Sequence, residues 1–98
     1  MNYLYLIKAG KHYKIGWTKD INSRVKLFQT GNAYPIEIVV NYPTGMPIQA
    51  LEAWFHKAFA DKRVNGEWFE LDDSDLVRFG ELVVSEKPKE FYVPEGSL

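Results

Sequence analysis

The feature that most constrains the fold is a pair of alternating runs at the beginning of the sequence. Side chains along residues 2–8 alternate with period two, which is typical of a strand that has one face on a core. Residues 12–17 alternate in the same way. Only Ala9-Gly10-Lys11 separates the two runs, and a short connection that contains glycine favours an antiparallel hairpin.

The middle of the sequence predicts a helix, a strand and a second helix. Asp20 is a good N-cap and Gly31 a good stop for a helix of about three turns. Residues 36–42 are rich in β-branched side chains and predict a third strand. Residues 47–60 predict a helix with one apolar stripe.

The last third predicts a short extended piece and a final helix. Gly66 breaks the chain, and the apolar residues of 68–71 are expected to pin that piece to the core. Asp72 resembles the start of a helix that Pro88 would end. The order β-β-α-β-α-(short β)-α predicts an α/β (α+β) fold, with a small three-stranded antiparallel sheet flanked by helices. We expect one domain over residues 1–86 and a tail over residues 87–98.

Composition excludes several classes of site. The chain has 98 residues, which suits one domain, and it has no cysteine, so disulfides and thiolate sites are excluded. No run approaches the roughly 18 apolar residues of a membrane span. The apolar start is too short and too alternating for a signal peptide, and a soluble cytoplasmic protein is expected.

The charges are divided unevenly along the chain. Residues 1–30 hold six basic side chains and one acidic, whereas residues 61–98 hold five basic and ten acidic. This asymmetry favours a polyanion that approaches the N-terminal part, although both parts could be ordinary solvated surface.

Two sets of residues could carry chemistry. Glu52 and His56 are four residues apart, so they lie on the same face of the predicted helix, one turn from each other. They could form a metal site or a weak surface pair. Tyr5 and Lys14 lie on neighbouring predicted strands, with Arg24 one turn into the next helix. A close ammonium would lower the pKa of Tyr5, and a guanidinium suits two phosphate oxygens, although all three could be plain structural residues.

Together these positions resemble the GIY-YIG nuclease superfamily. Tyr3-Leu4-Tyr5 followed by Lys14-Ile15-Gly16 resembles its paired motif, and Arg24 follows Gly16 by the family's eight-residue step. Ala50-Leu51-Glu52 resembles the segment that bears its metal-binding glutamate. Together with Gly66-Glu67-Trp68-Phe69, these motifs are similar to those of a compact branch of the superfamily that is found in phage and bacterial genomes. The similarity covers about residues 3–71.

The resemblance implies a role for each matching position. Tyr5 would lie near the attacking water, Arg24 would stabilise the phosphate, and Glu52 would hold one Mg²⁺ or Mn²⁺. Gly16 would pack tightly at the motif turn. Lys14 stands where the family has its second tyrosine, and this departure weakens the catalytic interpretation.

Further residues are expected to assist around this centre. His56 could orient the metal water or contact DNA, and Glu67 could hold a catalytic cation. Trp68 and Phe69 are expected to be core anchors. Side chains that could contact the substrate are His12, Lys11, Trp17, Lys19 and Lys26.

The leading hypothesis is a metal-dependent DNA endonuclease that nicks with low sequence specificity. The alternative is a catalytically weak module that binds DNA or a protein partner, as a phage–host adaptor or inhibitor would. The third hypothesis is a purely structural protein with no nucleic-acid role. No membrane partner is expected, and a homodimer or protein partner stays open.

Overall fold

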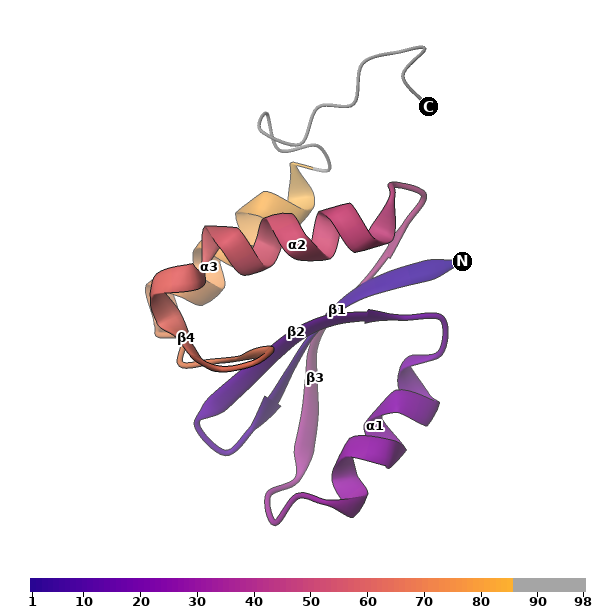
Figure 1. Ribbon diagram of the computed structural model, residues 1–98, viewed down its shortest axis with the longest axis vertical. Helices are drawn as coiled ribbons and strands as arrows, with labels where there is room; N and C mark the ends of the chain where they lie inside the picture. Colours follow the sequence, from indigo (N-terminus) through magenta and orange to yellow (C-terminus); the bar gives the residue numbers. More distant parts are fainter. Residues whose placement is uncertain (86–98) are drawn as a thin grey trace.

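The computed structural model describes residues 1–85 as one sheet with helices on both faces (Figure 1). The strands are β1 (Asn2–Ala9), β2 (His12–Thr18), β3 (Ile36–Thr44), β4 (Arg63–Asn65) and β5 (Trp68–Phe69). The helices are α1 (Ile21–Thr30), α2 (Ile48–Ala58) and α3 (Asp73–Val84), with a 3-10 turn over Ala60–Lys62. The expected tail over residues 87–98 lies outside the described residues, as does Pro88.

The sheet has five antiparallel strands in the order β3-β1-β2-β5-β4. The predicted fold class is confirmed, but the prediction of three strands was wrong. Gly66 adopts a φ of 55°, which lets the chain reverse between β4 and β5. The expected extended piece therefore pairs with the three residues before Gly66 as well as with β2, where Trp68 lies opposite Lys14.

The helix starts follow the predicted caps. The Asp20 carboxylate accepts hydrogen bonds from the backbone N–H groups of Asn22 and Ser23, at 3.1 and 3.3 Å. Asp72 and Asp75 form a reciprocal capping box at the start of α3. Helix α3 ends at Val84, before the predicted stop. Within residues 1–85 no helix is long and apolar enough to cross a bilayer.

Strand β3 runs two residues further than predicted, through Pro43 to Thr44. A proline has no N–H to donate, so it is tolerated in a strand that lies at an edge of the sheet. Strand β3 is such an edge, because β1 is its only neighbour in the described sheet.

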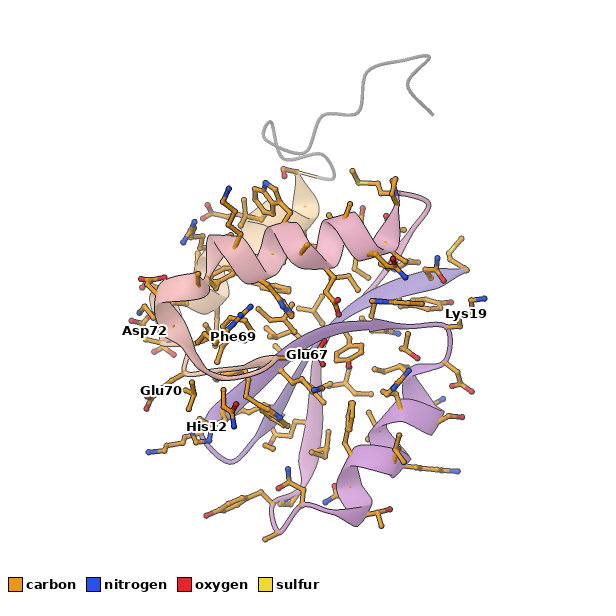
Figure 2. All side chains as sticks on the ribbon, in the orientation of Figure 1. His12, Lys19, Glu67, Phe69, Glu70 and Asp72 are labelled. Carbon is orange, nitrogen blue, oxygen red and sulfur yellow. The ribbon has the colours of Figure 1, made fainter. Side chains whose placement is uncertain are left out.

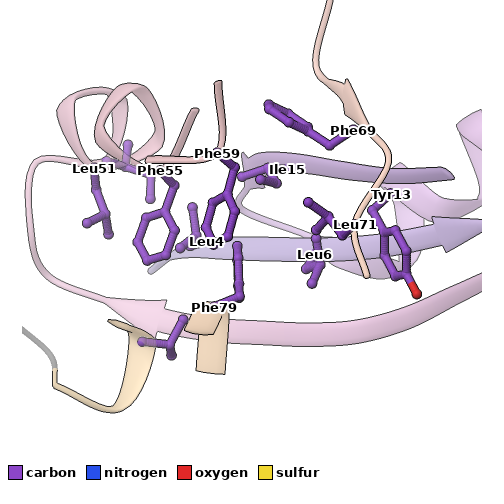
Figure 3. Packing of buried hydrophobic residues seen from close by; sticks show 12 residues of the cluster. Leu4, Leu6, Tyr13, Ile15, Leu51, Phe55, Phe59, Phe69, Leu71 and Phe79 are labelled. Atoms are coloured by element: carbon purple, nitrogen blue, oxygen red, sulfur yellow. The ribbon is translucent and has the colours of Figure 1, made fainter. Parts of the chain in front are cut away.

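The hydrophobic core lies between one face of the sheet and helices α2 and α3 (Figure 3). The ring of Phe79 on α3 lies 4.9 Å from that of Phe55 and 5.8 Å from that of Phe59, so α3 packs behind α2. The opposite face is covered by α1, in which no residue is fully buried. Helix α1 packs on this second face through Phe28, whose ring meets that of Tyr5.

Candidate active site

Four side chains that the sequence singled out line one cavity of about 240 Å³. Tyr5 comes from β1, Lys14 from β2, Arg24 from α1 and Glu52 from α2. The rest of the lining is Trp17, Phe28 and Glu67. Along β2 the cavity extends from Lys14, which pairs with β5, to Trp17, which lies beyond that pairing.

Tyr5 and Gly16 are opposite each other in the β1–β2 register. A Cβ built on Gly16 would lie 2.6 Å from Cζ of Tyr5, well inside contact distance. The Tyr5 side chain is 2% exposed, and its ring meets the Phe28 ring edge-on with 6.4 Å between centroids. The absence of a side chain at Gly16 therefore leaves the space that the Tyr5 phenol occupies.

Lys14 donates a 2.9 Å hydrogen bond from Nζ to Oε2 of Glu67. The Lys14 side chain is 11% exposed and that of Glu67 is 42% exposed. The ammonium also lies 5.0 Å from the Phe28 ring centroid and 5.4 Å from that of Trp68, within the range of cation–π attraction. Figure 2 shows Glu67 near the middle of the molecule, on the chain that runs below α2.

The two carboxyl groups of the cavity differ in acidity. Burial, followed by the charge of Glu67 and a hydrogen bond with it, raises the pKa of Glu52 to about 7. Burial also acts to raise the pKa of Glu67, but the hydrogen bond and charge of Lys14 outweigh it and the pKa falls below its ordinary value. Near neutral pH Glu52 is therefore the member of the pair that carries a proton.

The expectation that Lys14 lowers the pKa of Tyr5 was wrong. Burial raises the pKa of Tyr5 far above its ordinary value, the Glu67 carboxylate raises it further, and Arg24 offsets only part of the effect. Lys14 is paired with Glu67, so its charge is neutralised before it can favour a phenolate. Tyr5 is a phenol at neutral pH.

His56 lies one turn along α2 from Glu52, with Nε2 2.7 Å from the carbonyl oxygen of Ile15. A carbonyl only accepts hydrogen bonds, so Nε2 carries the proton and a neutral ring keeps its lone pair on Nδ1. Glu52, His56 and Glu67 each offer one ligand atom, and these atoms lie within 4.8 Å of one another. This group could hold a metal ion.

The other expected substrate contacts lie apart from this cavity, except Trp17. Lys11 and His12 line a separate cavity, and Lys19 lines a third together with Trp17. Lys26 is on the exposed side of α1, outside these three cavities. In Figure 2 His12 and Lys19 are at opposite ends of the sheet, with Glu67 between them.

Sequence reasoning missed two features of the site. Glu67 was expected only to hold a catalytic cation, and its place in the carboxyl pair was not foreseen. No local signal could have shown this, because Glu67 reaches Lys14 only through the pairing of β5 with β2, in which Trp68 lies opposite Lys14. Phe69 is fully buried as expected, but Trp68 is only half-buried and lines the cavity of Lys11 and His12, so its prediction as a core anchor was wrong.

Comparison with known protein families places the chain in a domain family. The model of the T5orf172 domain matches residues 2–84. This domain is found in phage proteins and is associated with nuclease-like folds. No curated protein and no solved structure matches the chain significantly.

Proposed function

The chain belongs to the T5orf172 domain family, and we propose that it is a divalent-metal-dependent DNA endonuclease of the GIY-YIG type. The observation that carries the proposal is the convergence of Tyr5, Lys14, Arg24 and Glu52 on one cavity. These residues come from four elements spread over almost fifty positions. One site per chain suits a single-strand nick, and so small a domain suits low sequence specificity.

The donor set fits a hard divalent cation. Glu52 and Glu67 offer carboxylate oxygens beside the His56 ring. Once Glu52 has lost its proton, Lys14 balances only one of the two negative charges. Carboxylate oxygens are the ligands that Mg²⁺ and Mn²⁺ prefer. Glu52 would hold the ion, with Glu67 as a supporting carboxylate, and the ion when bound would act as a Lewis acid on the phosphate.

The remaining residues bind and orient the substrate. The exposed Arg24 guanidinium lies 5.9 Å from the Phe28 ring centroid, which holds it at the cavity for a bidentate contact with phosphoryl oxygens. The Tyr5 phenol orients the attacking water by hydrogen bonding. Lys14 keeps Glu67 ionised and adds positive charge beside the phosphate.

A binding-only module is the second candidate, and one observation favours it. A tyrosine whose pKa is raised by burial is a poor general base. If no other group assists the attacking water, the same cavity would bind a phosphate without cutting it.

A plasmid-nicking assay separates the two candidates. The purified chain is incubated with supercoiled plasmid and Mg²⁺ or Mn²⁺, beside Glu52→Ala and Tyr5→Phe variants and an EDTA control. Nicking that is lost in EDTA and in Glu52→Ala, and reduced in Tyr5→Phe, supports the enzyme. Intact plasmid with every metal, together with DNA binding by the wild type, supports the binding module for duplex substrates.

A further inference from the structure

A second cavity, of about 600 Å³, lies beside the candidate active site and has no role in the chemistry above. It opens between the β1–β2 turn, the loop after α1 and the β4–β5 hairpin. Its polar and aromatic lining consists of Lys11, His12, Asn32, Tyr34, Asn65 and Trp68.

The two cavities are lined by residues that neighbour one another on β2 and β5. His12 and Lys14 are two residues apart on β2, so their side chains project from the same face about 7 Å apart. Trp68 is the register partner of Lys14, and its ring lies 5.4 Å from the Lys14 ammonium. A chain of phosphates that crosses the active site therefore reaches the large cavity within one nucleotide step.

The lining has the chemistry that recognises a nucleobase. Tyr34 is 61% exposed and its ring rests on Gly10, where an added Cβ would come within 3.2 Å of the ring. Tyr34 and Trp68 thus offer aromatic surface at which a base can stack. The Asn32 side chain accepts a 3.1 Å hydrogen bond from the Tyr34 backbone N–H through Oδ1, which leaves its amide NH₂ to donate.

We propose that this cavity binds the base of one unpaired nucleotide next to the phosphate that is cut. The proposal rests on the nuclease function and specifies its substrate class, DNA with an unstacked nucleotide. A base inside a duplex shows only its edges, so the faces of Tyr34 and Trp68 would have nothing to stack on. Lys11 at the rim contributes positive charge for the flanking phosphate.

Fluorescence anisotropy in EDTA tests the proposal with three labelled DNAs. One duplex carries a single unpaired thymidine, the second carries an abasic residue at that position, and the third is fully paired. The wild type is expected to bind the unpaired thymidine roughly 5- to 100-fold more tightly than the abasic duplex, because only the base differs. Tyr34→Ala should abolish this preference and Tyr34→Phe should keep it. Val77→Ala, which truncates an equally exposed side chain on α3, should leave it unchanged.

The outcomes separate this proposal from the nuclease function. Equal affinity of the wild type for the unpaired and abasic duplexes overturns the base site and leaves plasmid nicking unaffected. A preference that survives in Tyr34→Ala, with a normal thermal unfolding curve, also overturns it. Absence of binding to all three DNAs at low salt, together with absence of nicking, overturns both proposals.

Discussion

The hydroxyl of Tyr5 lies against the backbone of Gly16 on the neighbouring strand, with no room for a side chain between them. Strand pairing brings the two residues opposite each other, and the missing side chain lets the ring lie flat across β2 toward the cavity. The tightness of this contact leads to a first prediction.

Gly16→Ala is expected to destabilise the fold by about 1–3 kcal/mol, because the new Cβ displaces a buried ring. Nicking should be lost as Tyr5 moves. Urea unfolding measures the stability, with Gly45→Ala as the control because nothing lies within 4 Å of a Cβ built there. The penalty should shrink in a Tyr5→Phe background, since the nearest atom is the hydroxyl oxygen. An equal penalty in both backgrounds would contradict the proposed clash.

Glu52→Gln is expected to stabilise the metal-free protein at pH 8 but not at pH 4.5. The folded state raises the pKa of Glu52 to about 7, so folding is penalised once this group ionises, over the window between its ordinary pKa and about 7. The group is partly exposed, and the gain at pH 8 is therefore about 1 kcal/mol after allowance for solvent screening. Unfolding curves in EDTA at both pH values measure it. Glu81→Gln, on the exposed side of α3, should change stability by less than about 0.5 kcal/mol at either pH.

The nicking rate at sub-saturating Mg²⁺ is expected to rise roughly tenfold from pH 6 to pH 8. A proton and a cation compete for Glu52, whose pKa is about 7, so the loaded fraction grows as the group ionises. Initial rates across this range measure the effect. A flat profile would show that Glu52 does not limit metal loading.

Glu67→Gln should move the midpoint of that pH profile down by roughly one unit, because the Glu67 charge helps to raise the pKa of Glu52. Burial is the larger cause and remains, so the midpoint should stay above the ordinary glutamate range. The maximal rate should fall as well, since Lys14 loses its ionised partner. An unchanged midpoint would mean that the two carboxyl groups are not coupled.

Arg24→Ala is expected to lower the nicking rate about 10²-fold or more without a change in stability, because Arg24 is exposed and acts on the phosphate. Arg24→Lys should recover part of the rate, since it keeps the charge but not the planar fork. Lys26→Ala removes a neighbouring exposed charge from the same helix and should have a much smaller effect. Equal losses in Arg24→Ala and Lys26→Ala would indicate general electrostatic attraction instead of a specific contact.

The hairpin, the caps and the apolar stripe of α2 could be predicted because each depends on local sequence. The alternation in residues 2–8 and the N-cap at Asp20 both depend on residues that are close together in the sequence. The β4–β5 hairpin escaped prediction, because strands of three and two residues leave no periodic signal. Strand β5 joins the sheet by pairing with β2, more than fifty positions away, and β4 joins it only through β5.

Most residues of the candidate site could be selected from the sequence, but their charge states and pKa shifts could not be predicted from it. The charge state of Tyr5 depends on which partner Lys14 finds, and that partner is a carboxylate 53 positions away. The coupling of Glu52 to Glu67 depends on the same long-range approach. Trp68 was misjudged because alternation in a two-residue strand does not reveal which side faces the core.

The packing of Phe79 against Phe55 and Phe59 has a consequence for the timing of synthesis. Helix α2 carries Glu52, His56 and Phe55, and Phe59 is its C-cap residue. Helix α3 is the last described element to leave the ribosome. Until α3 has emerged, α2 can pack on the sheet, but Phe79 is missing from the cluster of aromatic rings on its apolar side. The candidate site on α2 therefore reaches its final packing only after translation has passed residue 84.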